Sequence, residues 1–158
     1  FNRAPFMLYF GQEFGERGMD KEGFSGPDGR TSIFDYCTVP SIRRWLLDRL
    51  TVDELVVYKE YSRLLKIATS DAIFSQGDTF DLMYANPDSE RFDGNRQFVF
   101  MRGYEGSCML VAANFEGRPV EMEVNIPTEA YSFFGLEKEG EKLEVRVGAR
   151  DYMRVNLV

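Results

Sequence analysis

The chain has 158 residues, 44% of them hydrophobic and 15% aromatic, with 26 acidic against 19 basic side chains and a net charge of −7. This apolar content is enough for a folded core, and the acidic balance argues against nucleic acid and anionic membranes, because both need clustered Lys and Arg. We therefore expect neither nucleic acid nor membrane as a partner. The sequence also contains no run of 18 apolar residues, the length that a membrane-spanning helix needs.

The absence of histidine and the small number of cysteines limit the kinds of catalytic and metal site that the chain can contain. The chain has no histidine, which excludes a Ser-His-Asp triad, a Cys-His dyad and every histidine-ligated metal centre. Cys37 and Cys108 lie far apart, in different predicted elements. Both are therefore expected to be free, and neither a disulfide framework, a metal site nor a cofactor is predicted.

The N-terminal stretch contains one candidate strand and then a long loop. Residues 6–10 read FMLYF and stop at Gly11, and a run this short and apolar predicts a strand buried on both faces, as in a parallel sheet. No neighbouring strand for it is evident in the sequence. Residues 11–50 are predicted to be a loop, because they are dense in residues that favour turns. A helical turn or two is expected in SIRRWLLDRL, residues 41–50.

Residues 52–68 carry the clearest helical pattern. Thr51 or Asp53 can cap the N-terminus, and Glu54 lies in the first turn. Apolar side chains then recur close to a 3.6-residue period, and charged side chains occupy much of the opposite face. The apolar positions are Leu55, Val56, Tyr58, Tyr61, Leu64, Leu65 and Ile67, and the charged positions are Lys59, Glu60, Arg63 and Lys66. We predict one amphipathic helix from Val52 to Ala68.

Everything after residue 70 reads as short strands rich in Val, Phe, Tyr and Met. The candidate strands are TFDLMYA, RQFVFMRGY, SCMLVAANF, PVEMEVNIP, KLEVRVG and DYMRVNLV. Strict alternation in the fourth of them predicts that Val120, Met122, Val124 and Ile126 face inward. The segments YEGS and FEGRP are typical of hairpins.

The predicted fold is therefore mainly β. We expect an antiparallel β-sandwich of Greek-key type, with six to eight strands, over residues 71–158. One amphipathic helix, within residues 1–70, precedes it. The aromatic side chains of residues 71–158, among them Phe98, Phe100, Tyr104, Phe115, Phe133 and Phe134, are expected in its core.

Three motifs follow one another in a specific order. They are PFMLYFGQEFGE at residues 5–16, the pattern Tyr61-x-x-Leu64-Leu65-Lys66, and residues 96–127, which contain an aromatic-x-Phe-x-Arg and a Leu-Val-x-x-Asn-aromatic sequence. Together they resemble the C-terminal part of an alpha-amylase-family glycoside hydrolase. The resemblance implies that residues 1–70 are the end of a (β/α)₈ barrel, with residues 6–10 as its eighth strand and residues 52–68 as its eighth helix. Residues 71–158 would be the C-terminal β-sandwich domain.

The resemblance also implies that the chain has no catalytic residue of its own. In the family, the nucleophile, the acid/base and a third Asp lie at the ends of earlier barrel strands, upstream of Phe1. The acids of the glycine-rich loop are then either solvated residues that keep the loop soluble, or part of the barrel face where active sites are built. On the second interpretation Gln12 and Glu13 shape the substrate cleft of the parent enzyme. The loop acids are Glu13, Glu16, Asp20, Glu22, Asp28 and Asp35.

Two functions from different classes remain open. The first is a non-catalytic region of an alpha-amylase-type hydrolase acting on alpha-glucans, inactive alone and stabilising the barrel. The second is a carbohydrate-binding module that holds starch-like glucan, and an unrelated β-sandwich is a third possibility. Loop aromatics can serve either role, as hydrophobic anchors or as rings that stack on sugars: Phe24, Phe34, Tyr36 and Trp45. The expected partners are the barrel of the parent chain, an alpha-glucan, and a second copy paired through residues 6–10; no compartment is predicted.

Overall fold

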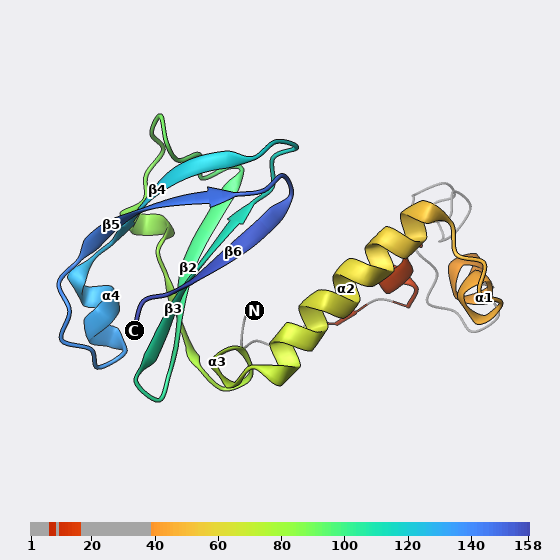
Figure 1. The fold of residues 1–158 in the computed structure, drawn as a ribbon, viewed down its shortest axis with the longest axis horizontal. Helices are drawn as coiled ribbons and strands as arrows, with labels where there is room; N and C mark the ends of the chain where they lie inside the picture. The colour runs from red at the N-terminus through yellow and green to blue at the C-terminus, as the bar shows by residue number, and fades with distance from the viewer. Residues whose placement is uncertain (1–6, 9, 17–38) are drawn as a thin grey trace, which may run out of the picture. The chain divides into compact units, whose positions relative to one another are not determined.

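The computed structural model describes residues 7–8, 10–16 and 39–158 (Figure 1). These residues divide into two compact units, a helical unit that ends at Ala68 and a sheet unit from Thr69 to Val158. About 33% of the described residues are helical and 33% are in strands. The prediction of a mainly β chain is therefore wrong, because helices account for as much of it as strands do.

The described residues of the helical unit form three helical elements. They are η1 (Gln12–Phe14), α1 (Pro40–Leu46) and α2 (Val52–Ser70), the last of which continues two residues into the sheet unit. The strand predicted over residues 6–10 is not present where the structure describes it: Met7 and Leu8 have no regular structure, and Phe10 lies in a turn. Phe6 and Tyr9 lie outside the described residues. A single strand has no ladder to join, because its backbone groups need a neighbouring strand.

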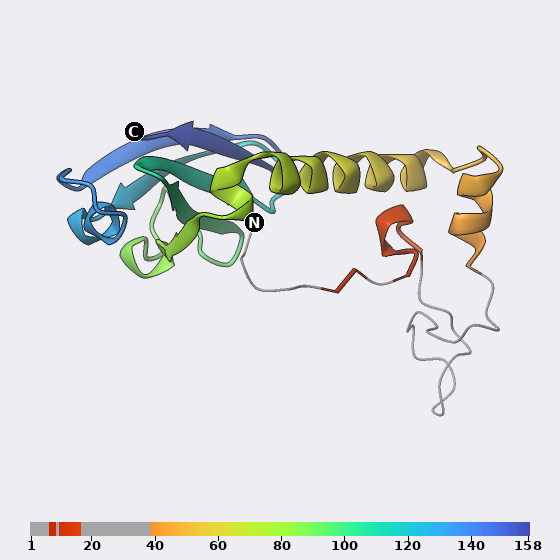
Figure 2. The ribbon, with the colours of Figure 1, turned by 90° about the horizontal axis from the view of Figure 1, so that it is seen from below.

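The helix predicted over Val52 to Ala68 is present as α2 (Figure 2). It ends at Ser70, two residues later than expected. Its N-terminus is a capping box, in which the Glu54 backbone N–H donates to Thr51 Oγ1 at 3.3 Å and the Thr51 N–H donates to Glu54 Oε2 at 2.9 Å. Thr51, and not Asp53, is therefore the cap. None of the described helices is long and apolar enough to cross a membrane.

The sheet unit contains six strands, but the first predicted one, residues 79–85, is a strand only as far as Asp81 and continues as a 3₁₀ helix. The six strands of the unit do not form one sandwich. Its elements are α3 (Ala72–Ser75), β1 (Asp78–Asp81), η2 (Met83–Ala85), β2 (Gln97–Tyr104), β3 (Ser107–Asn114), β4 (Val120–Ile126), α4 (Thr128–Phe133), β5 (Glu141–Val147) and β6 (Asp151–Asn156). The strands form a four-stranded antiparallel sheet in the order β1-β2-β3-β6 and a two-stranded sheet of β4 and β5. The Greek-key sandwich of six to eight strands is therefore wrong.

The connection after β3 explains this difference. YEGS is the predicted hairpin, with Glu105 and Gly106 at φ 48° and 81° between β2 and β3, as a tight two-residue turn requires. FEGRP is not a hairpin, because β4 leaves the first sheet and pairs with β5. The other edge of β4 meets a side chain: Asn86 Oδ1 accepts the Asn125 N–H at 2.7 Å, and Asn86 Nδ2 donates to the Asn125 carbonyl at 3.0 Å. This amide occupies a place where a further strand would pair.

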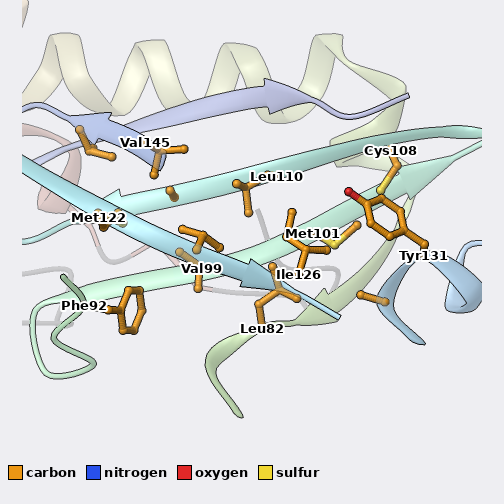
Figure 3. Packing of buried hydrophobic residues seen from close by; sticks show 14 residues of the cluster. Leu82, Phe92, Val99, Met101, Cys108, Leu110, Met122, Ile126, Tyr131 and Val145 are labelled. Atoms are coloured by element: carbon orange, nitrogen blue, oxygen red, sulfur yellow. The ribbon is translucent and has the colours of Figure 1, made fainter. Parts of the chain in front are cut away.

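The two sheets share one hydrophobic core (Figure 3). From β2 and β3, Val99 lies opposite Ala112 and Met101 opposite Leu110. From the facing sheet come Met122, Val124, Ile126, Val145 and Val147, all buried. The alternation predicted for β4 is confirmed, since Glu121, Glu123 and Asn125 all point away from the core. Tyr131 of α4 is fully buried and closes the core beside Cys108, which is free as predicted; Cys37 lies outside the described residues.

Candidate functional site

The turn that follows residues 6–10 is held on the two helices by one aromatic side chain. Phe14 is 4% exposed, and its ring stacks on Tyr58 of α2 at 5.5 Å and 16° and lies 5.5 Å from the Trp45 ring of α1. Gly11 has φ 87°, and a Cβ there would lie only 2.9 Å from Val39 Cγ1. Trp45 thus serves as an anchor of this turn; Phe24, Phe34 and Tyr36 lie outside the described residues.

Gln12 and Glu13, the residues predicted to border a substrate cleft, lie together on η1. Gln12 is exposed, and its Nε2 donates to the Tyr61 hydroxyl of α2 at 2.7 Å. Glu13 is half-buried. The Gln12–Tyr61 hydrogen bond joins the first motif of the sequence to the first residue of the second, so these two motifs are in direct contact. Asp20, Glu22, Asp28 and Asp35 lie outside the described residues.

The other described acids near this turn stabilise helix ends. Glu16 Oε2 accepts the Ser41 backbone N–H at 2.8 Å in the first turn of α1. Glu54 pairs with Arg44, whose Nε lies 3.0 Å from both carboxylate oxygens. This hydrogen bond, with those from Thr51, lowers the pKa of Glu54 from 4.5 to about 2. The lining of a cleft of about 580 Å³ includes Glu16, Arg44 and Glu54. Both acids are therefore already bound to groups of the two helices.

The helical unit leaves an unusual amount of apolar surface uncovered. No residue of α2 is buried, although an amphipathic helix of 19 residues normally buries its apolar stripe. Among the described residues of the unit only Gly11, Phe14 and Ser41 are buried, and the Ser41 hydroxyl has no hydrogen-bond partner. Six large apolar side chains between residues 45 and 56 are 38 to 79% exposed. We call them the α1–α2 apolar surface: Trp45, Leu46, Leu47, Val52, Leu55 and Val56.

In the sheet unit, the arginine of the aromatic-x-Phe-x-Arg motif is a buried clamp. Arg102 is 0% exposed. Its Nε donates to the Ile73 carbonyl at 3.0 Å, its Nη2 to the Phe74 carbonyl at 2.7 Å, and its Nη1 to Thr79 Oγ1. The guanidinium therefore satisfies carbonyl groups of α3 and ties this short helix to β1 and β2.

The asparagine of the third motif has a similar structural role. Asn114 is 1% exposed. Its Nδ2 donates to the carbonyls of Arg118 and Gly148, both at 2.8 Å, and its Oδ1 accepts the Glu116 N–H at 2.9 Å. One side chain thus joins the β3–β4 connection to the β5–β6 turn. The sequence analysis identified Arg102 and Asn114 only as parts of a motif. It could not predict their hydrogen bonds, because their partners lie up to 34 residues away.

The expectation that the strand aromatics are all core residues is wrong for several of them. Phe98, Phe115 and Phe133 are 40, 68 and 54% exposed, and Tyr84 of η2, which the strand pattern gave no reason to single out, is 61% exposed. Where exposed rings of the sheet unit contact other rings, the planes meet at angles of 43 to 86°. These contacting pairs do not form a flat platform.

The described residues contain no group of three or more Asp, Glu, Cys or His side chains that could hold a metal ion. Their acids are instead distributed over helix ends and surface ion pairs, such as Glu123 with Lys142 at 2.7 Å. Comparison of the chain with protein-family models and with curated proteins finds no match.

Proposed function

We propose that this chain is the non-catalytic C-terminal region of an alpha-amylase-type glycoside hydrolase acting on alpha-glucans, and that its role is to stabilise the catalytic barrel. The observation that carries the proposal is that α2 has no buried residue and that the α1–α2 apolar surface is uncovered. Apolar surface of this extent is typical of an interface. The partner that fits it is the remainder of the barrel, packed on α1 and α2 within the same parent chain.

The free energy gained by burying the α1–α2 apolar surface is comparable to the stability of a whole domain. Fully burying one side chain of this size contributes about 1.5–3 kcal/mol, and six partly exposed ones together contribute on the order of 5 to 10 kcal/mol. A whole domain is stable by about 5–15 kcal/mol. The α1–α2 apolar surface is therefore able to stabilise a barrel appreciably, and the helical unit gains its own missing core from the same contact.

The motif residues support a structural role as well. Gln12 and Tyr61 connect the two motifs that resemble the eighth strand and helix of the barrel. Arg102 and Asn114 are buried and bind backbone groups of the sheet unit, so neither is available to a substrate. The alternative of a flat glucan-binding platform is less favoured, because the contacting rings of the sheet unit are tilted.

A single substitution tests the proposal in two contexts. Val56 is 56% exposed in this chain, so Val56→Lys should leave the melting temperature of the isolated chain unchanged. In the intact parent protein the same substitution places a charge in the interface, and we expect the melting temperature to fall by roughly 5 °C. Arg146→Ala, at an exposed position of β5 in the sheet unit, is the matched control. An intact protein whose melting temperature is the same with and without the Val56→Lys substitution would overturn the proposal.

A further inference from the structure

We propose that the sheet unit has a docking surface for a basic polypeptide segment, one that presents Arg or Lys side chains next to apolar ones. The surface is formed by β1, η2, α4 and the connection from α4 to β5. Three aromatic rings and three carboxylates make it up, and we call them the η2–α4 surface: Phe80, Tyr84, Phe133, Asp81, Glu129 and Glu139. This contact is separate from the barrel contact proposed above, which involves the helical unit.

The rings of this surface contact one another and are accessible to a partner. The Phe80 ring of β1 lies 6.1 Å from the Tyr84 ring of η2 and 5.2 Å from the Phe133 ring of α4. Phe80 is half-buried, whereas Tyr84 and Phe133 are 61 and 54% exposed. Large exposed aromatic side chains that share one packed support are typical of a protein interface, where aromatic residues are enriched.

Two exposed carboxylates border the rings. Glu129 Oε1 accepts the Tyr84 hydroxyl at 3.1 Å, and Asp81 Oδ1 accepts the Met83 N–H at 2.8 Å. Neither acid forms an ion pair with any residue that the structure describes. Burial, the hydrogen bond to Glu129 and the charges of Glu129 and Asp81 raise the pKa of the Tyr84 hydroxyl. The electrostatic potential beside the Tyr84 ring is therefore negative.

A hollow of about 680 Å³ adjoins Glu129 and carries charge of the same sign. Its charged lining residues are Glu129, Glu139, Glu141 and Lys142. The lysine already binds Glu123 at 2.7 Å, and Glu141 binds Lys138 at 2.8 Å. The two other glutamates have no basic partner among the described residues. The hollow thus adds a third available carboxylate, that of Glu139, to the two beside the rings.

Rings and carboxylates together favour a cationic partner. A guanidinium or ammonium group over a Tyr or Phe ring is attracted by the negative face of the ring, and a neighbouring carboxylate can bind the same group through charge-assisted hydrogen bonds. A small cation alone would leave the apolar area of the rings uncovered, whereas a polypeptide also brings apolar side chains to them. The net charge of −7 attracts a basic partner from a longer distance.

Fluorescence anisotropy with residues 1–158 and a labelled peptide tests the proposal. The probe is a fluorescein-labelled peptide in which arginine, leucine and glycine alternate. One comparison peptide has citrulline, a neutral analogue, in place of every arginine, and a second has glutamate there. At low ionic strength we expect the chain to bind the arginine peptide, to bind the citrulline peptide several-fold more weakly and not to bind the glutamate peptide.

Substitutions that keep the net charge separate docking on the rings from a general attraction to an acidic chain. Tyr84→Ala and Phe133→Ala should each raise the dissociation constant of the arginine peptide about fivefold. Phe115→Ala is the matched control, because Phe115 is 68% exposed on the β3–β4 connection. Glu129→Gln should weaken binding more than Glu90→Gln, which removes the same charge from an exposed position of the β1–β2 connection.

Melting curves followed by circular dichroism separate lost binding from lost folding. Where either alanine variant is unfolded, Tyr84→Leu or Phe133→Leu replaces it, because leucine keeps apolar volume but has no aromatic face. The inference is wrong if the wild-type chain does not bind the arginine peptide, if both ring variants bind it as tightly as the wild type, or if Glu129→Gln and Glu90→Gln have equal effects. Equal affinity for the citrulline peptide would overturn the assignment to a basic partner.

Discussion

Arg44 of α1 and Glu54 of α2 form an ion pair in which the arginine Nε and Nη2 both donate to the carboxylate. The Glu54 side chain is 11% exposed, and it also accepts the N–H of Thr51 at the start of α2. One carboxylate thus closes the capping box and fixes the corner between the two helices. It connects a feature of the local sequence, the capping box, with a contact ten residues away.

This pair makes the stability of the helical unit depend on pH. The pKa of Glu54 is lowered to about 2, chiefly by the hydrogen bond from Arg44. Because the folded pKa lies below the ordinary value of 4.5, the stabilisation is present above about pH 4.5 and is lost as the pH falls towards 2. We expect Glu54→Gln, which can still form the capping box, to lower the melting temperature at pH 7 and to have little effect near pH 2. Melting curves followed by circular dichroism measure both.

The matched control is Glu60→Gln on the same helix. Glu60 pairs with Arg63 three residues later at 2.7 Å, and both side chains are largely exposed, so this pair should contribute little. Equal effects of Glu54→Gln at pH 7 and pH 2 would show that the ion pair is not the source of the pH dependence.

Arg102 should be among the residues most important for the stability of the sheet unit. Arg102→Met keeps much of the volume but leaves the carbonyls of Ile73 and Phe74 without these hydrogen bonds. Removing a buried charged partner of this kind costs about 3 kcal/mol, and urea unfolding should show it. Arg146→Met, at an exposed position of β5, is the control and should change the unfolding free energy little. A similar midpoint for both variants would contradict the role assigned to Arg102.

The isolated chain should have no glycosidase activity. Hydrolysis with a nucleophile and an acid/base needs two carboxyl groups roughly 5 Å apart across the scissile bond, and the resemblance assigns both to strands outside this chain. Reducing-sugar release from soluble starch should equal that of a buffer blank. Activity that co-purifies with the chain and is lost in a Glu13→Gln variant would refute this expectation.

The chain should also associate with itself through residues 6–10. Met7 and Phe10 are 77 and 59% exposed, and an exposed apolar segment of this kind is a template for pairing with its own copy. We expect light scattering to show a dimer whose dissociation constant rises at least tenfold in Phe10→Asp. Val158→Asp is a matched control, because Val158 is 58% exposed. A wild-type chain that stays monomeric at high concentration would exclude the dimer.

Local patterns in the sequence determined the elements that depend on neighbouring residues alone. A helix cap at Thr51, one of two candidates, the periodicity of α2, the alternation in β4 and the hairpin at residues 104–107 were predictable. Each rests on contacts or backbone preferences within a few residues, and these act in any surroundings.

Only the tertiary structure decided how the elements combine and which polar residues serve which partner. Asn86 and Asn125 are 39 residues apart, so no local pattern could show that a side chain, rather than a strand, meets the edge of β4. The burial of Arg102, the exposure of Tyr84 and the contact of Gln12 with Tyr61 depend in the same way on distant segments. Periodicity reports which side of an element is apolar, whereas the partner that covers that side is set by the packing of the whole chain.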